Sequence, residues 1–432
     1  MAPILWRLQS CGIDFPSPND EKSKVWSFPK KIAEKDIDFF RYLVENHQLL
    51  QIEYSIHCTL LAHDLLHKDR AKLTAQIETA LKIAELLEHI YRDYLNVPQE
   101  AERMRRDQLV YRELLAHQGY QFIDFEDEYV VDSSYTRVVR NTTGTANVPR
   151  NFIARLRRLL VATVVFASEF GEYRSAVNFI DQFITPILTF AAWIFFVPRS
   201  IINLFLLGKH LIPGPWMSEE EEALGWQTRF IGQLQRRWFE LANDVPWMIL
   251  GLLNCFLLVG PLAPIGFYAS AVLLAYDVLV ASFRTHIEVG RLKTVEVEYQ
   301  TMLKEDDLSQ SAREDINSYL FYLRQRIAYE RKRLYIQVVN TSVLFVAFAL
   351  AFPIFAFNPI IPLIGGALAV LMTIACYLAS NWVDKQRPVD RITLPPDLQK
   401  SVGTNGFFKP NPSSSPTYTE ALDEEEACSM SI

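Results

Sequence analysis

Residues 334–383 read LYIQVVNTSVLFVAFALAFPIFAFNPIIPLIGGALAVLMTIACYLASNWV, fifty residues without one Asp, Glu, Lys or Arg. A helix needs about 20 mostly apolar residues to cross the hydrocarbon core of a bilayer. The run is therefore long enough for two such helices, and Pro353, Asn358 and Pro359 mark a turn between them. We predict a transmembrane helical hairpin over 334–383.

A second apolar run, residues 245–283, repeats this plan, with Asp277 as its single charged residue and Gly260 and Pro261 in its turn. Both predicted turns are uncharged, whereas basic residues lie at the four outer ends of the hairpins. The positive-inside rule then places segment 284–333 and the C-terminal tail in the cytosol. These basic flanks are Arg236, Arg237, Arg284, Arg291, Lys293, Arg331, Lys332, Arg333, Lys385, Arg387 and Arg391.

A third apolar run, residues 182–208, is long enough to cross a membrane but contains Pro198 and Arg199. An arginine exposed to lipid is costly. Two alternatives stay open, a fifth span or a segment that bends at Pro198. The preceding residues 150–181 predict an amphipathic helix, which lies on the membrane surface or packs against the protein.

The remaining segments divide the chain further. Residues 1–35 contain turn formers and little periodicity, which predicts an irregular leader. Residues 36–149 predict a soluble domain of three helices followed by an acidic loop, because apolar residues recur there at steps of three and four. Residues 209–244 are predicted as a connecting segment.

Segment 284–333 predicts a cytosolic antiparallel helical hairpin, because apolar residues recur at coiled-coil spacing in both of its arms. The hairpin can pair with itself, with the N-terminal helices or with another chain. Its predicted interaction seam is Leu292, Val295, Tyr299, Met302, Ile316, Leu320, Leu323 and Ile327.

The last segment, residues 384–432, is rich in Pro and Ser and then acidic, which predicts a disordered tail. Its acidic residues, followed by a small and polar end, resemble the C-terminal translocation signal of bacterial type IVB secretion effectors. The resemblance covers about a dozen residues and implies export of the protein into a host membrane. The residues that carry it are Glu420, Asp423, Glu424, Glu425 and Glu426.

The composition agrees with a membrane protein that has soluble parts. Of 432 residues, 50% are hydrophobic and 22% charged, which is too apolar for an ordinary soluble enzyme and too charged for a wholly embedded transporter. The formal net charge of −7 argues against nucleic-acid binding, which needs a basic surface. Five widely spaced cysteines indicate neither a zinc site nor a disulfide framework.

Sequence motifs for chemistry are scarce. No nucleotide-binding, zinc-protease or serine-hydrolase motif occurs, so we predict no enzymatic activity and no cofactor. His63 and His67 have the spacing of two metal ligands on a helix, but no third ligand is evident, so we predict no metal site.

Polar residues inside the apolar runs are the remaining candidates for function. Asp277 is the strongest of these candidates, because acidic residues within membrane helices often take part in transport. Its available polar partners are Asn254, Asn340 and Arg199. Asp277 either holds the helices together by hydrogen bonding or lines an ion or proton path.

Together these patterns predict an all-α membrane protein with two transmembrane hairpins, one doubtful span, an N-terminal helical domain and a cytosolic helical hairpin. We expect a multi-pass integral membrane interaction protein whose partners are the lipid bilayer and a protein, or a second copy, bound through its helical segments. The alternative is an ion channel or transporter that uses Asp277.

Overall fold

The computed structural model describes residues 8, 9, 13, 25–67, 70–122, 185–304, 310–352, 354, 355 and 357–388, together with single positions between 152 and 183. This part of the chain is almost entirely helical, which confirms the predicted all-α class. A short parallel pair, β1 (Val25–Trp26) and β2 (Gln121–Phe122), is the exception within the described residues.

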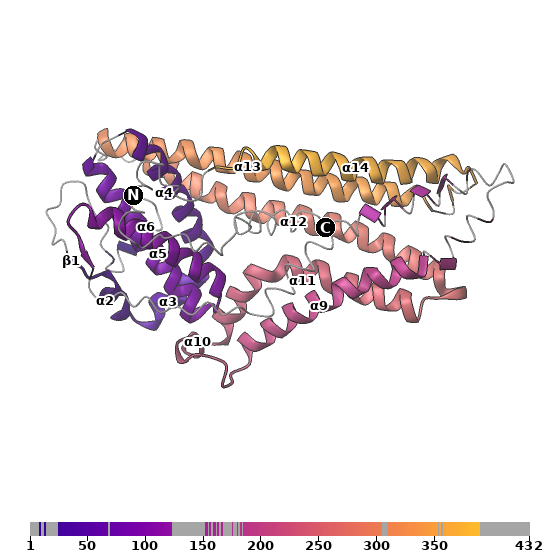
Figure 1. Ribbon diagram of the computed structural model, residues 1–432, viewed down its shortest axis with the longest axis horizontal. Helices are drawn as coiled ribbons and strands as arrows, with labels where there is room; N and C mark the ends of the chain where they lie inside the picture. The colour runs from indigo at the N-terminus through magenta and orange to yellow at the C-terminus, as the bar shows by residue number, and fades with distance from the viewer. Residues whose placement is uncertain are drawn as a thin grey trace, which may run out of the picture.

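The N-terminal helices form a compact unit, residues 25–122, which we call the head (Figure 1). Its largest buried side chains include Tyr54, Tyr91 and Tyr111. The helices of the head are α2 (Phe28–Ala33), α3 (Ile37–Glu45), α4 (His47–His67), α5 (Arg70–His89), the π-turn η1 (Ile90–Tyr94) and α6 (Pro98–Ala116).

Local sequence explains where these helices begin. The Asp36 carboxylate accepts a hydrogen bond from the Phe39 amide at 3.1 Å, which caps the first turn of α3. Pro98 is the first residue of α6, a position where its missing N–H leaves no hydrogen bond unmade.

The predicted irregular leader, residues 1–35, is wrong in its last third. From Val25 onward the chain forms β1 and α2, and Trp26, Phe28 and Ile32 are buried in the core of the head. Pro29 lies in the first turn of α2, where a proline is tolerated because the N–H that it lacks would have no partner within the helix.

The rest of the described chain forms long helices that run away from the head, which we call the stalk (Figure 1). Two of them contain 40 residues each, about 60 Å at 1.5 Å per residue. The stalk consists of α9 (Thr185–Leu211), α10 (Glu219–Ala223), α11 (Trp226–Phe256), the 3₁₀ turn η3 (Gly260–Leu262), α12 (Ala263–Met302), α13 (Gln310–Ala349) and α14 (Ile360–Asp384).

Most of the predicted connecting segment 209–244 is helical. Residues Trp226–Phe256 form one helix that begins far upstream of the apolar run at 245 and continues through Pro246. Helix α9 likewise continues through Pro198 and lies antiparallel to α11, where the Asn203 amide donates to Glu240 at 3.0 Å. Pro198 therefore does not end the helix.

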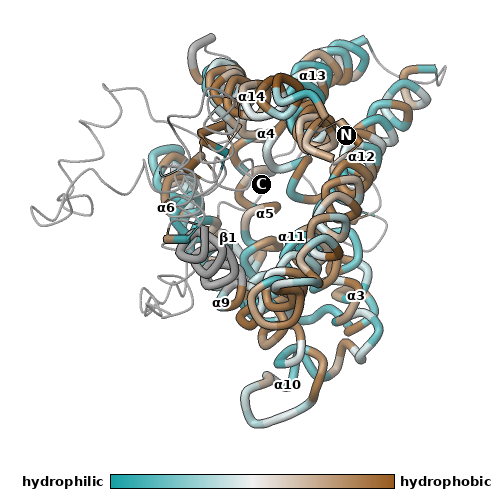
Figure 2. Tube along the Cα trace, turned by 90° about the vertical axis from the view of Figure 1, so that its right-hand side faces the viewer, coloured by the Kyte–Doolittle hydropathy of each residue, from teal (hydrophilic) through white to brown (hydrophobic). Residues whose placement is uncertain are grey.

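Two of the four predicted hairpin arms lie in helices that are long and apolar enough to cross a membrane, Gly260–Met302 and Ile360–Asp384. In each, only 22% of the most apolar 18-residue window is buried, unlike the core helix of a soluble protein. Their exposed side chains include Leu279, Leu371 and Leu378, and the same stretches are brown in Figure 2.

The other two arms lie in α11 and α13, which are not among the described helices that are long and apolar enough to cross a membrane. In α11 the charge-free part is 245–256, and in α13 it is 334–349. These helices pack beside α12 and α14 (Figure 1). Helices α13 and α14 approach each other closely at Gly365. A Cβ atom added there would lie 2.6 Å from the carbonyl oxygen of Ala347.

Candidate functional site

The head and the stalk share one hydrophobic core. Of the eight seam residues, seven are buried in the same cluster as the core of the head, and Met302 is partly buried and packs against that cluster. Leu323 is fully buried, and Leu320 is 3% exposed. Helix α4 of the head covers α13, so the N-terminal helices occupy the seam.

A buried carboxyl group lies at the centre of this junction. The Tyr299 hydroxyl of α12 donates to the Glu53 carboxyl at 3.2 Å, and the Tyr319 hydroxyl of α13 donates to the same group. The two tyrosine rings stack at 4.1 Å between centroids. One side chain of α4 thus links both arms of the stalk base, and sequence reasoning did not single out Glu53.

Burial disfavours the charged form of Glu53 and raises the pKa of its carboxyl from 4.5 to about 7, although the two tyrosine hydrogen bonds act in the opposite direction. The folded protein therefore binds a proton here at pH values where the unfolded chain does not. The stability from this group is complete below about pH 4.5 and is lost as the pH rises through about 7.

We expect Glu53→Gln, which is neutral at every pH, to remove this pH dependence. The difference between 4.5 and about 7 corresponds to about 3 kcal/mol of unfolding free energy. Thermal melting of the full chain in detergent at pH 5 and pH 8 measures it, and the advantage of the Gln variant over the parent should grow toward pH 8. An advantage that is equal at both pH values would contradict the titration of Glu53.

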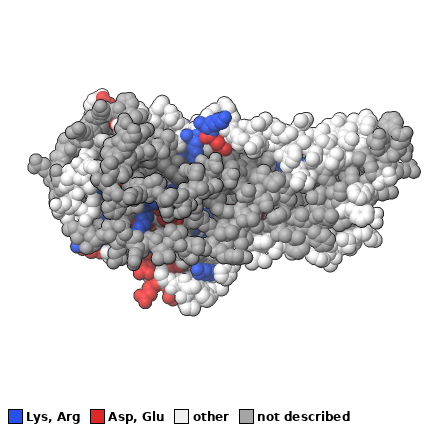
Figure 3. Space-filling view, viewed as in Figure 1, with Lys and Arg blue, Asp and Glu red and all other residues white. Residues whose placement is uncertain are grey.

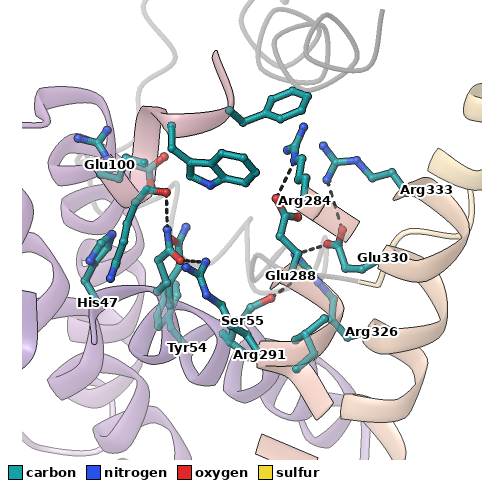
Figure 4. Close-up of a pocket in the computed structure, with 18 of the residues that line it drawn as sticks. His47, Tyr54, Ser55, Glu100, Arg284, Glu288, Arg291, Arg326, Glu330 and Arg333 are labelled. Carbon is teal, nitrogen blue, oxygen red and sulfur yellow. Dashed lines mark hydrogen bonds and ion pairs between the residues drawn. The ribbon is translucent and has the colours of Figure 1, made fainter. Parts of the chain in front are cut away.

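A cavity of about 490 Å³ lies beside this junction, between the head and helices α11, α12 and α13. Figure 4 shows Arg284, Glu288, Glu330 and Arg333 on one side of it, and His47 and Glu100 on the other. Four of its charged residues are the glutamates Glu100, Glu240, Glu288 and Glu330. Seven more are arginines: Arg103, Arg236, Arg284, Arg291, Arg326, Arg333 and Arg387.

Ion pairs order much of this lining. Arg284 contacts Glu288 at 2.7 Å, and Glu330 contacts both Arg326 at 3.1 Å and Arg333 at 3.5 Å. These pairs hold guanidinium groups at the wall of the cavity in fixed orientations.

Two contacts join the cavity wall to the head. The Arg326 guanidinium donates to the Ser55 hydroxyl at 3.2 Å, and that of Arg291 donates to the Gln48 side chain. Burial lowers the pKa of Arg291, but an arginine stays charged at neutral pH.

Among the described residues that line the cavity, positive charge is in excess. Seven arginines against four glutamates leave an excess of three. His47 adds no charge at neutral pH, since burial lowers the pKa of its imidazole to about 4. The arrangement suits an anion with several negative charges.

The intramembrane candidates do not come together as a group. The indole of Trp247 on α11 donates to both carboxylate oxygens of Asp277, at 3.1 and 2.9 Å. Asn254 lies against Gly266, and Asn340 is 5% exposed with no hydrogen-bond partner for its side-chain oxygen.

The side chain of Arg199 and the acidic tail, including Glu420–Glu426, lie outside the described residues. Among the described residues, no three His, Cys, Asp or Glu side chains are grouped to hold a metal ion. His63 instead contacts Asp64 at 3.2 Å.

Some residues that line the cavity stand out in the sequence, but for a different predicted role. Arg236, Arg284, Arg291, Arg333 and Arg387 line the cavity, and all five belong to the basic flanks of the apolar runs. The flanks indicated orientation only, because the sequence does not show that they converge. Trp247 is the partner of Asp277 because α11 and α12 face each other. No local pattern in the sequence indicates this pairing.

No protein-family model, curated protein or solved structure matches this chain.

Proposed function

We propose that this chain is a multi-pass integral membrane interaction protein, in which the apolar half of the stalk is the anchor and the head presents a binding surface in the cytosol. The observation that best supports this proposal is the hydrophobic core that the head shares with the base of the stalk. Because the core continues from one into the other, the anchor holds the head in a fixed orientation at the membrane.

The seam is not the binding surface, since its residues are covered within the chain. The exposed surface around α10 is better suited to bind a partner. It combines the apolar Ile212, Trp216 and Trp226, each at least 49% exposed, with the exposed acids Glu219, Glu220 and Glu222. Figure 3 shows acidic side chains gathered over this element. We call these six residues the α10 surface.

Contacts with the head hold the α10 surface in place. The Arg41 guanidinium donates to the carbonyls of Leu224 and Ala223 at 3.2 and 3.1 Å, and the Ser218 hydroxyl donates to the Asp93 carbonyl at 3.1 Å. An exposed apolar patch on a rigid support marks an interaction site. Its carboxylates favour a protein partner with a basic surface.

The α10 surface lies away from the proposed membrane. Trp226 precedes the apolar run, which begins at 245, by nineteen residues on the same helix, about 28 Å toward the head. Clustered glutamates would also be repelled by anionic lipid. Exposed tryptophans at this level are therefore better suited to a protein than to a bilayer.

Photocrosslinking from single positions in native membranes tests the proposal. A photoreactive residue at Ile212 or Trp226 should give a discrete adduct with another protein, weakened by added salt. The matched position Leu320 in the seam should give only links within the chain, to α4. Intermolecular adducts from Leu320, with none from Ile212 or Trp226, would contradict the proposal.

Transport through Asp277 is the weaker alternative. Both of its carboxylate oxygens accept from Trp247, and Asn254 and Asn340 are not its partners in the described hydrogen bonds. This supports the structural role, in which Asp277 fixes α12 against α11. Export into a host membrane stays a proposal based on the tail resemblance alone.

A further inference from the structure

The arginine-lined cavity lies at the level where the stalk changes from charged to apolar. Arg284 is the first charged residue after run 245–283, and Arg333 is the last before run 334–383. Both line the cavity. If those runs are embedded, as the proposed function requires, the cavity lies at the boundary between membrane and cytosol.

Aromatic side chains mark the same level. The ring of Trp238 contacts that of Phe283 edge-on at 5.8 Å, and the Arg284 guanidinium lies 4.2 Å from the centroid of Phe239. Trp238 and Phe239 also line the cavity. Tryptophan and arginine at helix ends are typical of the headgroup region of a bilayer.

The chemistry of the lining selects for phosphate groups. A guanidinium has five N–H donors, and a carboxylate partner such as Glu288 or Glu330 uses only some of them. The remaining donors suit phosphate oxygens, which arginine binds in bidentate geometry. Neutral amides from Gln48, Gln51 and Gln235 also line the cavity and suit hydroxyl groups.

The size and charge of the cavity restrict the class of ligand further. A volume of about 490 Å³ lies within the range of small-molecule sites and exceeds the needs of a single phosphate ion. The excess of three positive charges matches an anion with two or three phosphates. A phosphorylated polyol satisfies both conditions.

We propose that this cavity binds a multiply phosphorylated polyol, the chemistry shared by a phosphoinositide headgroup and a soluble inositol phosphate. Its lining comes from the head and from the stalk base. A bound ligand would therefore bridge the two and would stabilise the docked head.

The test uses the full chain with two probes. Inositol 1,4,5-trisphosphate is titrated against the protein in detergent, and vesicles containing phosphatidylinositol 4,5-bisphosphate are compared with phosphatidylserine vesicles of equal charge. We expect binding that weakens with salt, and that inorganic phosphate does not match. Binding of the soluble probe alone identifies a free ligand, and preference for the bisphosphate vesicles identifies a lipid.

The variants Arg291→Gln and Arg326→Gln should each lower affinity about tenfold. Arg106→Gln, at an arginine that does not line the cavity and whose side chain is 52% exposed, is the matched control and should leave binding unchanged. Arg291→Lys keeps the charge but loses the bidentate geometry, so its affinity should lie between those of the parent and of Arg291→Gln. Melting curves identify any variant that fails to fold.

The proposal is wrong if the parent protein binds neither probe better than inorganic phosphate, or if Arg291→Gln, folded, binds as well as Arg106→Gln. Titration of the soluble probe in detergent does not depend on membrane insertion. Its outcome therefore separates this proposal from the proposed function, which fails if the stalk does not span a bilayer.

Discussion

Replacing Leu320 and Leu323 together by Asp should separate the head from the stalk while the protein stays in the membrane. Leu323 is fully buried, Leu320 is 3% exposed, and both pack in the shared core. Each substitution removes a buried leucine and places an unpaired carboxylate there, so the combined cost should be about 4 kcal/mol or more. Head release by limited proteolysis of membranes measures the effect.

A neighbouring position supplies the matched control. Phe321 lies between the two leucines and is 58% exposed, so Phe321→Asp places the same charge on the outer face of α13. It should leave the protease pattern nearly unchanged. Equal resistance of the double variant and the Phe321 variant would show that the shared core does not hold the head. All three positions precede the charge-free run at 334, so membrane extraction should not differ.

The elements that follow from periodicity were predictable from the sequence. The steps of three and four that placed Leu320 and Leu323 in a seam identify residues that are buried. Three helices were predicted for the head from the same pattern, and the first of them is divided at Asn46 into α3 and α4. Such elements depend on interactions between near neighbours in the sequence.

The features that depend on distant contacts were not predictable. Glu53 is one acid among many on a helix, and only the approach of Tyr299 and Tyr319 makes it a buried link. The cavity likewise forms only when arginines from five segments of the chain, between Arg103 and Arg387, come together in the fold. Without an assembled fold, each of those arginines is only a basic flank or a solvated residue.

The central claim is that the stalk crosses a membrane and holds the head on its cytosolic side. Cysteine labelling in sealed vesicles of known orientation tests it, in a background where the five native cysteines are replaced. Single cysteines are placed at the exposed positions Ala116 in the head, Gln310 at the stalk base, and Leu257 and Phe357 in the turns at the far end of the stalk (Figure 1).

An impermeant maleimide should label Ala116→Cys and Gln310→Cys from the cytosolic side. It should label Leu257→Cys and Phe357→Cys only from the opposite side. Labelling of Phe357→Cys and Gln310→Cys from the same side would contradict a spanning stalk, and labelling of Ala116→Cys from the side opposite Gln310→Cys would contradict a head that is docked on its base.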